Sequence, residues 1–115
     1  MARPHVRPGE VVSVLPLGER IAGARTAALL KAEQLEVVRL VLHAGESLRE
    51  HRVDGEITVL CLEGLIEFST PEAVHRLAAG DFLHLPAGRP HALWAEADAS
   101  ALLTICIAGL HQPAP

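Results

Sequence analysis

The sequence predicts an all-β protein, a small barrel or sandwich of short strands. Its 115 residues are enough for one domain with a hydrophobic core. Half of the residues are apolar, which is typical of a globular chain rather than a disordered one. Eight or so short apolar runs are separated by turns that contain glycine or proline, and few stretches favour helix. This pattern predicts strands that pair around a common core.

The first third of the chain gives the weaker signals. Residues 1–9 hold two prolines and are predicted to form a loose arm. The apolar run 11–15 is stopped by Pro16, and residues 17–24 are predicted to hold one short helical turn. Residues 26–32 are ambiguous, because alanine favours helix whereas the neighbouring segments favour strands.

From residue 35 onward the strand signals are stronger. Glu63-Gly64 is predicted to be the tight turn of a hairpin. The polar stretch 46–56 is predicted to be a loop, and the tail 109–115 is predicted to fray. The predicted strands cover residues 35–42, 57–62, 65–69, 74–78, 82–85, 91–96 and 101–108.

Charge and hydropathy restrict the partners and the compartment. Ten basic and fourteen acidic residues are mixed along the chain without a basic stripe, so we expect no nucleic-acid partner. No apolar run approaches the roughly 20 residues that cross a bilayer, and the N-terminus lacks the apolar core of a signal peptide. We therefore expect a cytoplasmic protein without membrane contact. Cys61 and Cys106 lie in apolar runs and are predicted to be buried free thiols. The excess of arginine over lysine suggests a GC-rich bacterial genome.

The stretch from Gly80 to His91 is the most informative part of the chain. A short apolar strand is followed by a tight turn that contains Pro86, Gly88 and Pro90. Proline fixes φ and glycine adopts conformations that other residues avoid, so this turn has a defined shape. The turn delivers His91 to a fixed place at the start of the next apolar strand. A histidine held there is a candidate ligand or base.

The spacing of this stretch resembles the second motif of the cupin superfamily, which consists of small β-barrels of the jelly-roll type. In that motif a glycine, a proline, a second glycine and a histidine stand at fixed intervals, followed by an asparagine. Gly80, Pro86, Gly88 and His91 match the first four positions, and Ala95 replaces the asparagine.

The segment from Gly45 to Gly64 is similar to the first cupin motif. Both of these glycines and His51 fit its spacing. The position of its second histidine holds Val53. The position of its glutamate holds Ile57, or Thr58 if the gap is one residue longer.

The resemblance implies a cupin-type double-stranded β-helix, a jelly-roll barrel. We expect a single domain over residues 1–115, with the barrel at about 35–108 and a strand-rich N-terminal arm before it. Complete cupins hold a divalent metal with three histidines and one glutamate, and imidazole suits Fe, Mn, Ni, Cu and Zn. By resemblance, His51 and His91 occupy two of these four ligand positions.

The alternation of strand residues extends the predicted site into a cavity. If Ile57 and His91 face inward, so do the residues two and four positions further along their strands. The cavity is then mostly apolar around two histidines. Its predicted ligand-binding residues are His51, Val53, Ile57, Val59, Cys61, His91, Leu93 and Ala95.

A catalytic metal normally needs about three protein ligands, so two histidines would require a third group. Glu56 is adjacent to the expected glutamate position, but its parity points it to the other face unless a bulge at Gly55 reverses this. His84 lies on the strand that leads into the turn, and its face is not fixed by the pattern. Further candidates are His43, Glu50 and Asp54.

These observations leave three functional hypotheses. The first is a cupin that binds a small organic ligand without turnover, and the missing metal ligands favour it. The second is a metal-dependent oxygenase, isomerase or decarboxylase with a reduced ligand set. The third is a structural or protein-interaction module. Arg49 or Arg52 could bind a substrate carboxylate, although a solvated loop explains both more simply. Strands apolar on both faces predict a homodimer.

Overall fold

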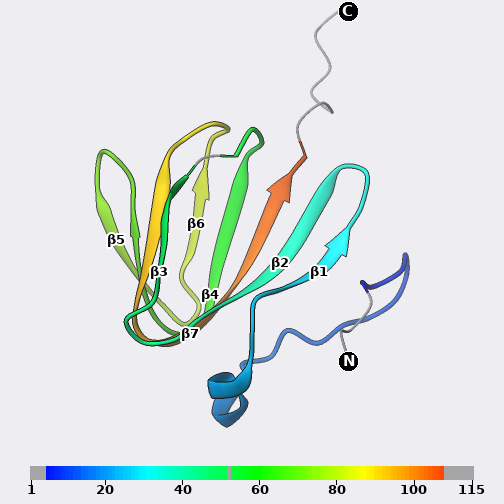
Figure 1. Ribbon diagram of the computed structural model, residues 1–115. Coiled ribbons are helices and arrows are strands. Elements are labelled where there is room, and N and C mark those ends of the chain that lie inside the picture. Colours follow the sequence, from blue (N-terminus) through cyan, green and yellow to red (C-terminus); the bar gives the residue numbers. More distant parts are fainter. Residues whose placement is uncertain (1–4, 52, 108–115) are drawn as a thin grey trace, which may run out of the picture.

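The computed structural model describes residues 5–51 and 53–107, except for the side chains of residues 49–51, and it consists mainly of antiparallel strands (Figure 1). This confirms the predicted all-β class. Within these residues no helix is long and apolar enough to cross a membrane. The elements in chain order are a 3-10 helix η1 (Gly18–Gly23) and the strands β1 (Ala27–Lys31), β2 (Leu35–Leu42), β3 (Ser47–His51), β4 (Ile57–Ser69), β5 (Val74–Ala78), β6 (Phe82–Leu85) and β7 (His91–Cys106).

Two long strands, β4 and β7, run through the whole fold and join its two halves. The first half of β4 pairs with β6 and with the second half of β7, which also pairs with β2, and β2 pairs with β1. The second half of β4 pairs with β5 and with the first half of β7, which also pairs with β3. Both long strands curve through a bend at the lower end of Figure 1. The core fills the space between the two halves.

Alternation along β4 explains which side chains form the core. Before the bend, Ile57, Val59 and Cys61 are buried, and after it Ile66 and Phe68 are buried. The inward positions therefore change from odd to even numbers. The ladder between β4 and β7 shifts register between Cys61 and Ile66, and such a bulge turns the strand so that apolar side chains still face inward after it.

Three expectations about the strands were wrong. Glu63-Gly64 does not reverse the chain into a hairpin, because β4 is one strand that bends there. The run 91–96 and residues 101–106 of the run 101–108 likewise belong to a single strand, β7, that continues through the polar residues between them. The stretch 46–56 is not all loop, since it contains β3, which pairs with β7.

The N-terminal part matches the expectations more closely. The predicted helical turn is confirmed as η1. The ambiguous segment 26–32 contains β1, because pairing with β2 gives its backbone groups partners that an isolated segment lacks. The predicted strand-rich arm holds η1 and, of the strands, only β1 in its described part.

Gly64 provides a test of the bend. An alanine Cβ at Gly64 would lie 2.2 Å from the carbonyl oxygen of Asp98, and the φ of Gly64 is +82°. Gly80 has a similar φ of +90° but open space around it. We expect Gly80→Ala to cost about 1–2 kcal/mol of unfolding free energy from backbone strain alone. Gly64→Ala should cost roughly 3–5 kcal/mol, because overpacking adds to the strain.

Urea denaturation of both variants measures this difference. Equal losses in the two variants would show that β4 and β7 accommodate the added methyl group at Gly64 without a cost from overpacking.

Candidate functional site

The turn before β7 places His91 at one end of the barrel. Gly88 in this turn has a φ of +75°, and its N–H donates to the carbonyl oxygen of Val53 at 2.8 Å. The turn is thereby tied to the segment between β3 and β4. We call this end, formed by residues 53–56 and 86–91, the mouth of the barrel. In Figure 1 it lies at the top, away from the bend.

The structure brings the two motif halves together at the mouth. The backbone of His51 in β3 lies opposite that of His91 in β7, because the two residues are paired in the register of these strands. The side chain of His51 lies outside the described part of the structure, as do those of Arg49, Glu50 and Arg52. The assignment of these side chains to a site therefore stays a prediction.

The imidazole of His91 is buried, and its contacts within the described residues include Arg89 and Phe68. Its Nδ1 lies 3.0 Å from the carbonyl oxygen of Arg89. A carbonyl oxygen only accepts hydrogen bonds, so Nδ1 carries a proton and donates it. The ring also stacks on Phe68, with centroids 5.4 Å apart and planes 8° from parallel. His91 is 3% exposed, so the ring has a fixed orientation in an apolar setting.

The apolar residues predicted to line the cavity belong to the hydrophobic core. Cys61 and Ala95 have no exposed surface, and Val59 is 1% exposed. Ile57 and Leu93 are also buried, whereas Val53 is only partly buried against this core. The packing is close at the depth of Val59 and Cys61. Of the apolar residues predicted to line the cavity, Val53, at the mouth near His91, therefore lies nearest to solvent.

The two cysteines differ in their surroundings. Cys61 is buried, and burial raises the pKa of its thiol, so it stays protonated at neutral pH. Its Sγ donates to the carbonyl oxygen of Glu63 at 3.4 Å. Cys106 was expected to be buried but is exposed at the end of β7. The alternation of β7 explains this, because Ile105 packs against the core and its neighbour must face outward.

The donor set at the mouth does not fit a metal centre of the complete cupin type. By the motif spacing, Val53 takes the place of the second histidine and Ile57, or Thr58, that of the glutamate, so neither the expected imidazole nor the expected carboxylate is present there. Among the side chains that the structure describes, no three His, Cys, Asp or Glu residues are grouped so that they could hold a metal.

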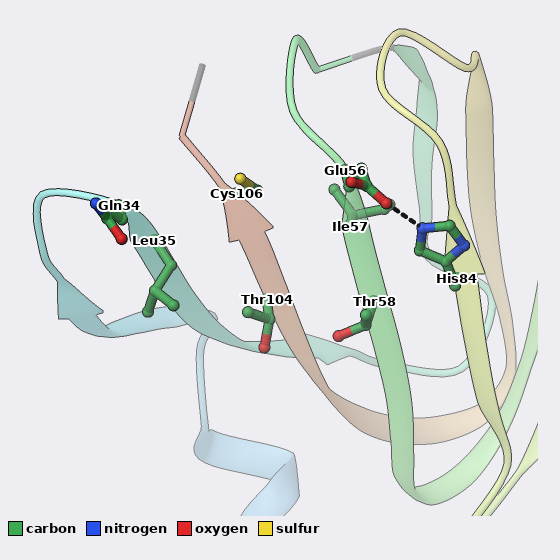
Figure 2. A pocket seen from close by; sticks show the side chains of 8 residues that line it. All are labelled: Gln34, Leu35, Glu56, Ile57, Thr58, His84, Thr104 and Cys106. Carbon is green, nitrogen blue, oxygen red and sulfur yellow. Dashed lines mark hydrogen bonds and ion pairs between the residues drawn. The ribbon is translucent and has the colours of Figure 1, made fainter. Parts of the chain in front are cut away.

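His84 and Glu56, two candidates for a third ligand, lie on the outer face of the barrel. Leu85, the neighbour of His84, belongs to the core, so His84 points the other way. Its Nε2 lies 2.7 Å from Oε1 of Glu56. This pair borders an open groove of about 440 Å³ that also includes Thr58 and Thr104 (Figure 2). Both side chains are therefore separated from His91 by the sheet.

The other candidates lie elsewhere. His43 is at the end of β2 and contacts Glu46 and Ile21, near the bend rather than the mouth. Asp54 is exposed in the segment between β3 and β4. Phe68 was not predicted as a site residue, although its place in an alternating apolar run already indicated an inward side chain.

Known proteins resemble the chain over the same region. A cupin-domain family profile matches residues 38–108. A search of curated proteins finds no match. Among solved structures, an RmlC-like cupin protein from Desulfovibrio desulfuricans is 27% identical, with a TM-score of 0.72, over 84% of this chain and 96% of that one.

Two further structures show the same fold. A cupin superfamily protein from Desulfitobacterium hafniense is 22% identical, with a TM-score of 0.70, over 85% of this chain and 99% of that chain. A conserved protein of unknown function from Streptococcus pyogenes is 24% identical, also with a TM-score of 0.70, over 93% and 97% of the two chains. The two halves joined by β4 and β7 are thus the double-stranded β-helix that the sequence predicted. Because the family profile covers more than half of the chain, the protein belongs to the cupin superfamily.

Proposed function

We propose that this cupin binds a small organic molecule at the mouth of the barrel, beside His91, and does not convert it chemically. The observation that carries this proposal is the buried imidazole of His91, oriented by the carbonyl group of Arg89 and stacked on Phe68. A fixed polar group among apolar side chains is typical of binding sites for small molecules, where few polar contacts fix the orientation of the ligand.

The composition of the mouth suggests the class of ligand. Leu93 and Phe68 are buried beside His91, and Val53 is partly buried on the opposite segment. Such walls favour a compact molecule with an apolar body and one polar group that can hydrogen-bond to imidazole. The same walls disfavour a highly charged ligand, because its desolvation would not be compensated.

The metal-dependent alternative has less support. Of the four positions that bind metal in complete cupins, only His51 and His91 carry the residue type expected there, and structural and catalytic sites normally use three or more protein ligands. Two imidazoles would leave the ion weakly held. We therefore infer a binding role rather than metal-dependent turnover.

We also propose that two copies associate through the outer face of the half that contains β6. Phe82 is 63% exposed there and pairs with Leu60, which in turn pairs with Leu102. The three side chains form an apolar row across β6, β4 and β7. Exposed apolar rows of this kind favour association, because burial removes their surface from water.

Ligand binding can be tested by thermal shift with a panel of small organic acids, alcohols and aromatic compounds. A compound present at about ten times its Kd should raise the Tm by roughly 5 °C. His91→Leu should lose this shift, since leucine keeps the mouth apolar but removes the hydrogen-bonding group. His84→Leu, on the outer face, is the matched control and should keep it. A compound that stabilises both variants equally would place its binding site away from His91.

Metal content is tested by elemental analysis of protein purified without chelators and then titrated with Fe, Mn, Ni, Cu and Zn salts. We expect well below one equivalent of tightly bound metal per chain, because the donor set is incomplete. One full equivalent that disappears in both His51→Ala and His91→Ala would support the metal-dependent hypothesis instead.

The proposed association predicts a solution mass of twice the 12.3 kDa chain. Phe82→Lys should shift the mass to that of one chain, because a charge in the apolar row would have to be buried. Trp94→Lys is the control, since Trp94 is 41% exposed on the other half of the barrel. Light scattering after size exclusion distinguishes the outcomes. A monomeric wild type, or a Phe82→Lys variant that remains dimeric, would disprove this interface.

A further inference from the structure

The segment 13–24, here called the strap, crosses the outside of the barrel near the bend and is fastened there by charged side chains of the sheet. It contains η1, whose Ile21 is buried against the barrel. The strap precedes β1 in the chain and contains no strand itself. Its attachment therefore depends on side-chain contacts rather than on a ladder of backbone hydrogen bonds.

The first attachment is at the start of η1. The carboxylate of Glu63, in the bend of β4, accepts hydrogen bonds from the N–H groups of Leu17 at 2.8 Å and Gly18 at 3.0 Å. It also accepts one from the hydroxyl of Ser100 on β7. Arg39 on β2 adds a further attachment by donating to the carbonyl oxygen of Leu15 at 3.0 Å.

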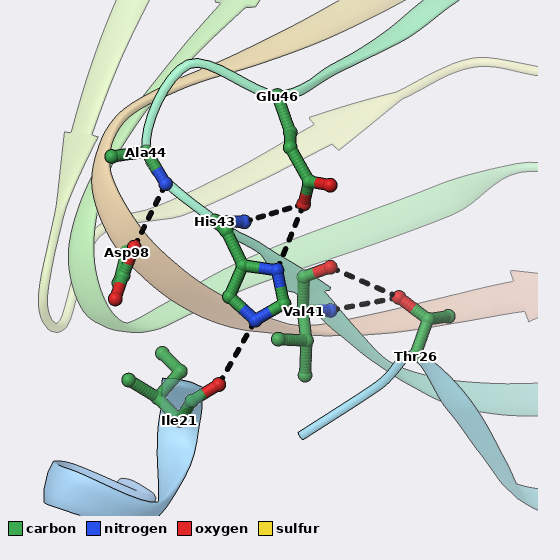
Figure 3. Close-up of polar contacts among 7 residues, drawn as sticks. All are labelled: Ile21, Thr26, Val41, His43, Ala44, Glu46 and Asp98. Carbon is green, nitrogen blue, oxygen red and sulfur yellow. Dashed lines mark hydrogen bonds and ion pairs between the residues drawn. The ribbon is translucent and has the colours of Figure 1, made fainter. Parts of the chain in front are cut away.

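The second attachment is at the other end of η1 and involves His43 (Figure 3). Nε2 of His43 lies 3.0 Å from the carbonyl oxygen of Ile21, and Nδ1 lies 3.1 Å from Oε1 of Glu46. A carbonyl oxygen and an ionised carboxylate can only accept hydrogen bonds. Both ring nitrogens must therefore carry protons for both contacts to form, which makes His43 an imidazolium cation.

We propose that His43 attaches the strap to the barrel in a pH-dependent way. The protonated ring of His43 holds η1 on the barrel, and the loss of a proton from this ring weakens the attachment. A neutral imidazole can donate through one nitrogen only, so either the contact with Ile21 or the contact with Glu46 is lost. The groups that face His43 are the Ile21 carbonyl from η1, Glu46 from the turn after β2, and Asp98 from β7. The carboxylate of Asp98 also accepts a hydrogen bond from the N–H of Ala44 at 2.8 Å.

The titration behaviour of the two attachments agrees with this assignment. The hydrogen bond to Ile21 raises the pKa of His43 above its ordinary value of 6.5, as do the carboxylates of Glu46 and Asp98, against an opposing effect of burial. A raised pKa means that the stabilisation is complete below pH 6.5 and is lost as the pH rises through the higher value.

The attachment at Glu63 depends on pH in the acidic range instead. Burial alone would raise the pKa of Glu63, but hydrogen bonds from Ser100, Leu17 and Gly18 outweigh it and lower the pKa below 4.5. Its contribution is present above pH 4.5 and is lost only as the pH falls through the lowered value. Between neutral and mildly alkaline pH, His43 is thus the attachment that titrates.

Amide hydrogen exchange measured by NMR tests this proposal. The N–H groups of Leu17, Gly18 and Ala24 are followed between pH 6 and pH 9 and corrected for the intrinsic exchange rate; Ala24 donates to the same Ile21 carbonyl at 3.1 Å. Their protection should fall by a factor of ten for each unit by which docking raises the pKa of His43. The N–H of Cys61 donates to the carbonyl oxygen of Asp81 at 2.9 Å and reports on the barrel, so its protection should not change with pH.

His43→Gln should give low protection of the strap at every pH, with the Cys61 amide unchanged. His84→Gln, a matched change on a histidine outside the strap contacts, should keep the pH dependence of the wild type. Wild-type protection that does not vary with pH, or a pH dependence that survives in His43→Gln, would overturn the proposal. So would ¹⁵N shifts showing a neutral His43 ring at pH 6.

Discussion

The backbone of Gly64 passes so close to that of Asp98 and Ala99 that no side chain fits between them. This contact, in the bend shared by β4 and β7, determines the rest of the architecture. Because both strands are continuous through it, each half of the barrel contains part of β4 and part of β7. The register shift beside it keeps apolar side chains inward on both sides of the bend. The position of the mouth at the opposite end follows from the same geometry.

At the mouth, contacts within the chain itself hold the two motif segments in place. The turn from Gly80 to His91 and the segment around Val53 meet through a backbone hydrogen bond, so neither needs an ion to hold its place. His91 obtains its orientation from Arg89 and Phe68 instead. Val53 and Ile57 add aliphatic surface near this end of the barrel, which suits apolar contact rather than coordination of an ion.

Features that depend on local chemistry were predictable from the sequence. The turn of Pro86 and Gly88 indicated where His91 would stand in the fold, and the apolar runs indicated the strands. The continuity of β4 was not predictable, because a glycine after a polar residue indicates a bend and a hairpin equally well. Strand β3 was missed since an edge strand with polar side chains resembles a loop.

The partners of side chains were the least predictable feature. The pattern left the face of His84 open, and the burial of its neighbour Leu85 together with the contact to Glu56 shows that it points outward. The contact of His43 with Ile21 had no local signal, because Ile21 is 22 residues away and on a different element. Contacts of this kind arise from the tertiary arrangement and leave no periodic signal in the chain.

The continuous strands also convert a small rotation at the bend into a larger displacement at their ends. From Leu65 to Ser69, β4 extends roughly 17 Å beyond the bend, at about 3.3 Å per residue. A rotation of about 5° at the bend would move the far end of β4 by about 1.5 Å, close to the radius of a water molecule. A small change at the groups that brace the bend, Glu63 and Ser100 among them, would therefore be felt as a larger displacement where β4 ends opposite Ala92, next to His91.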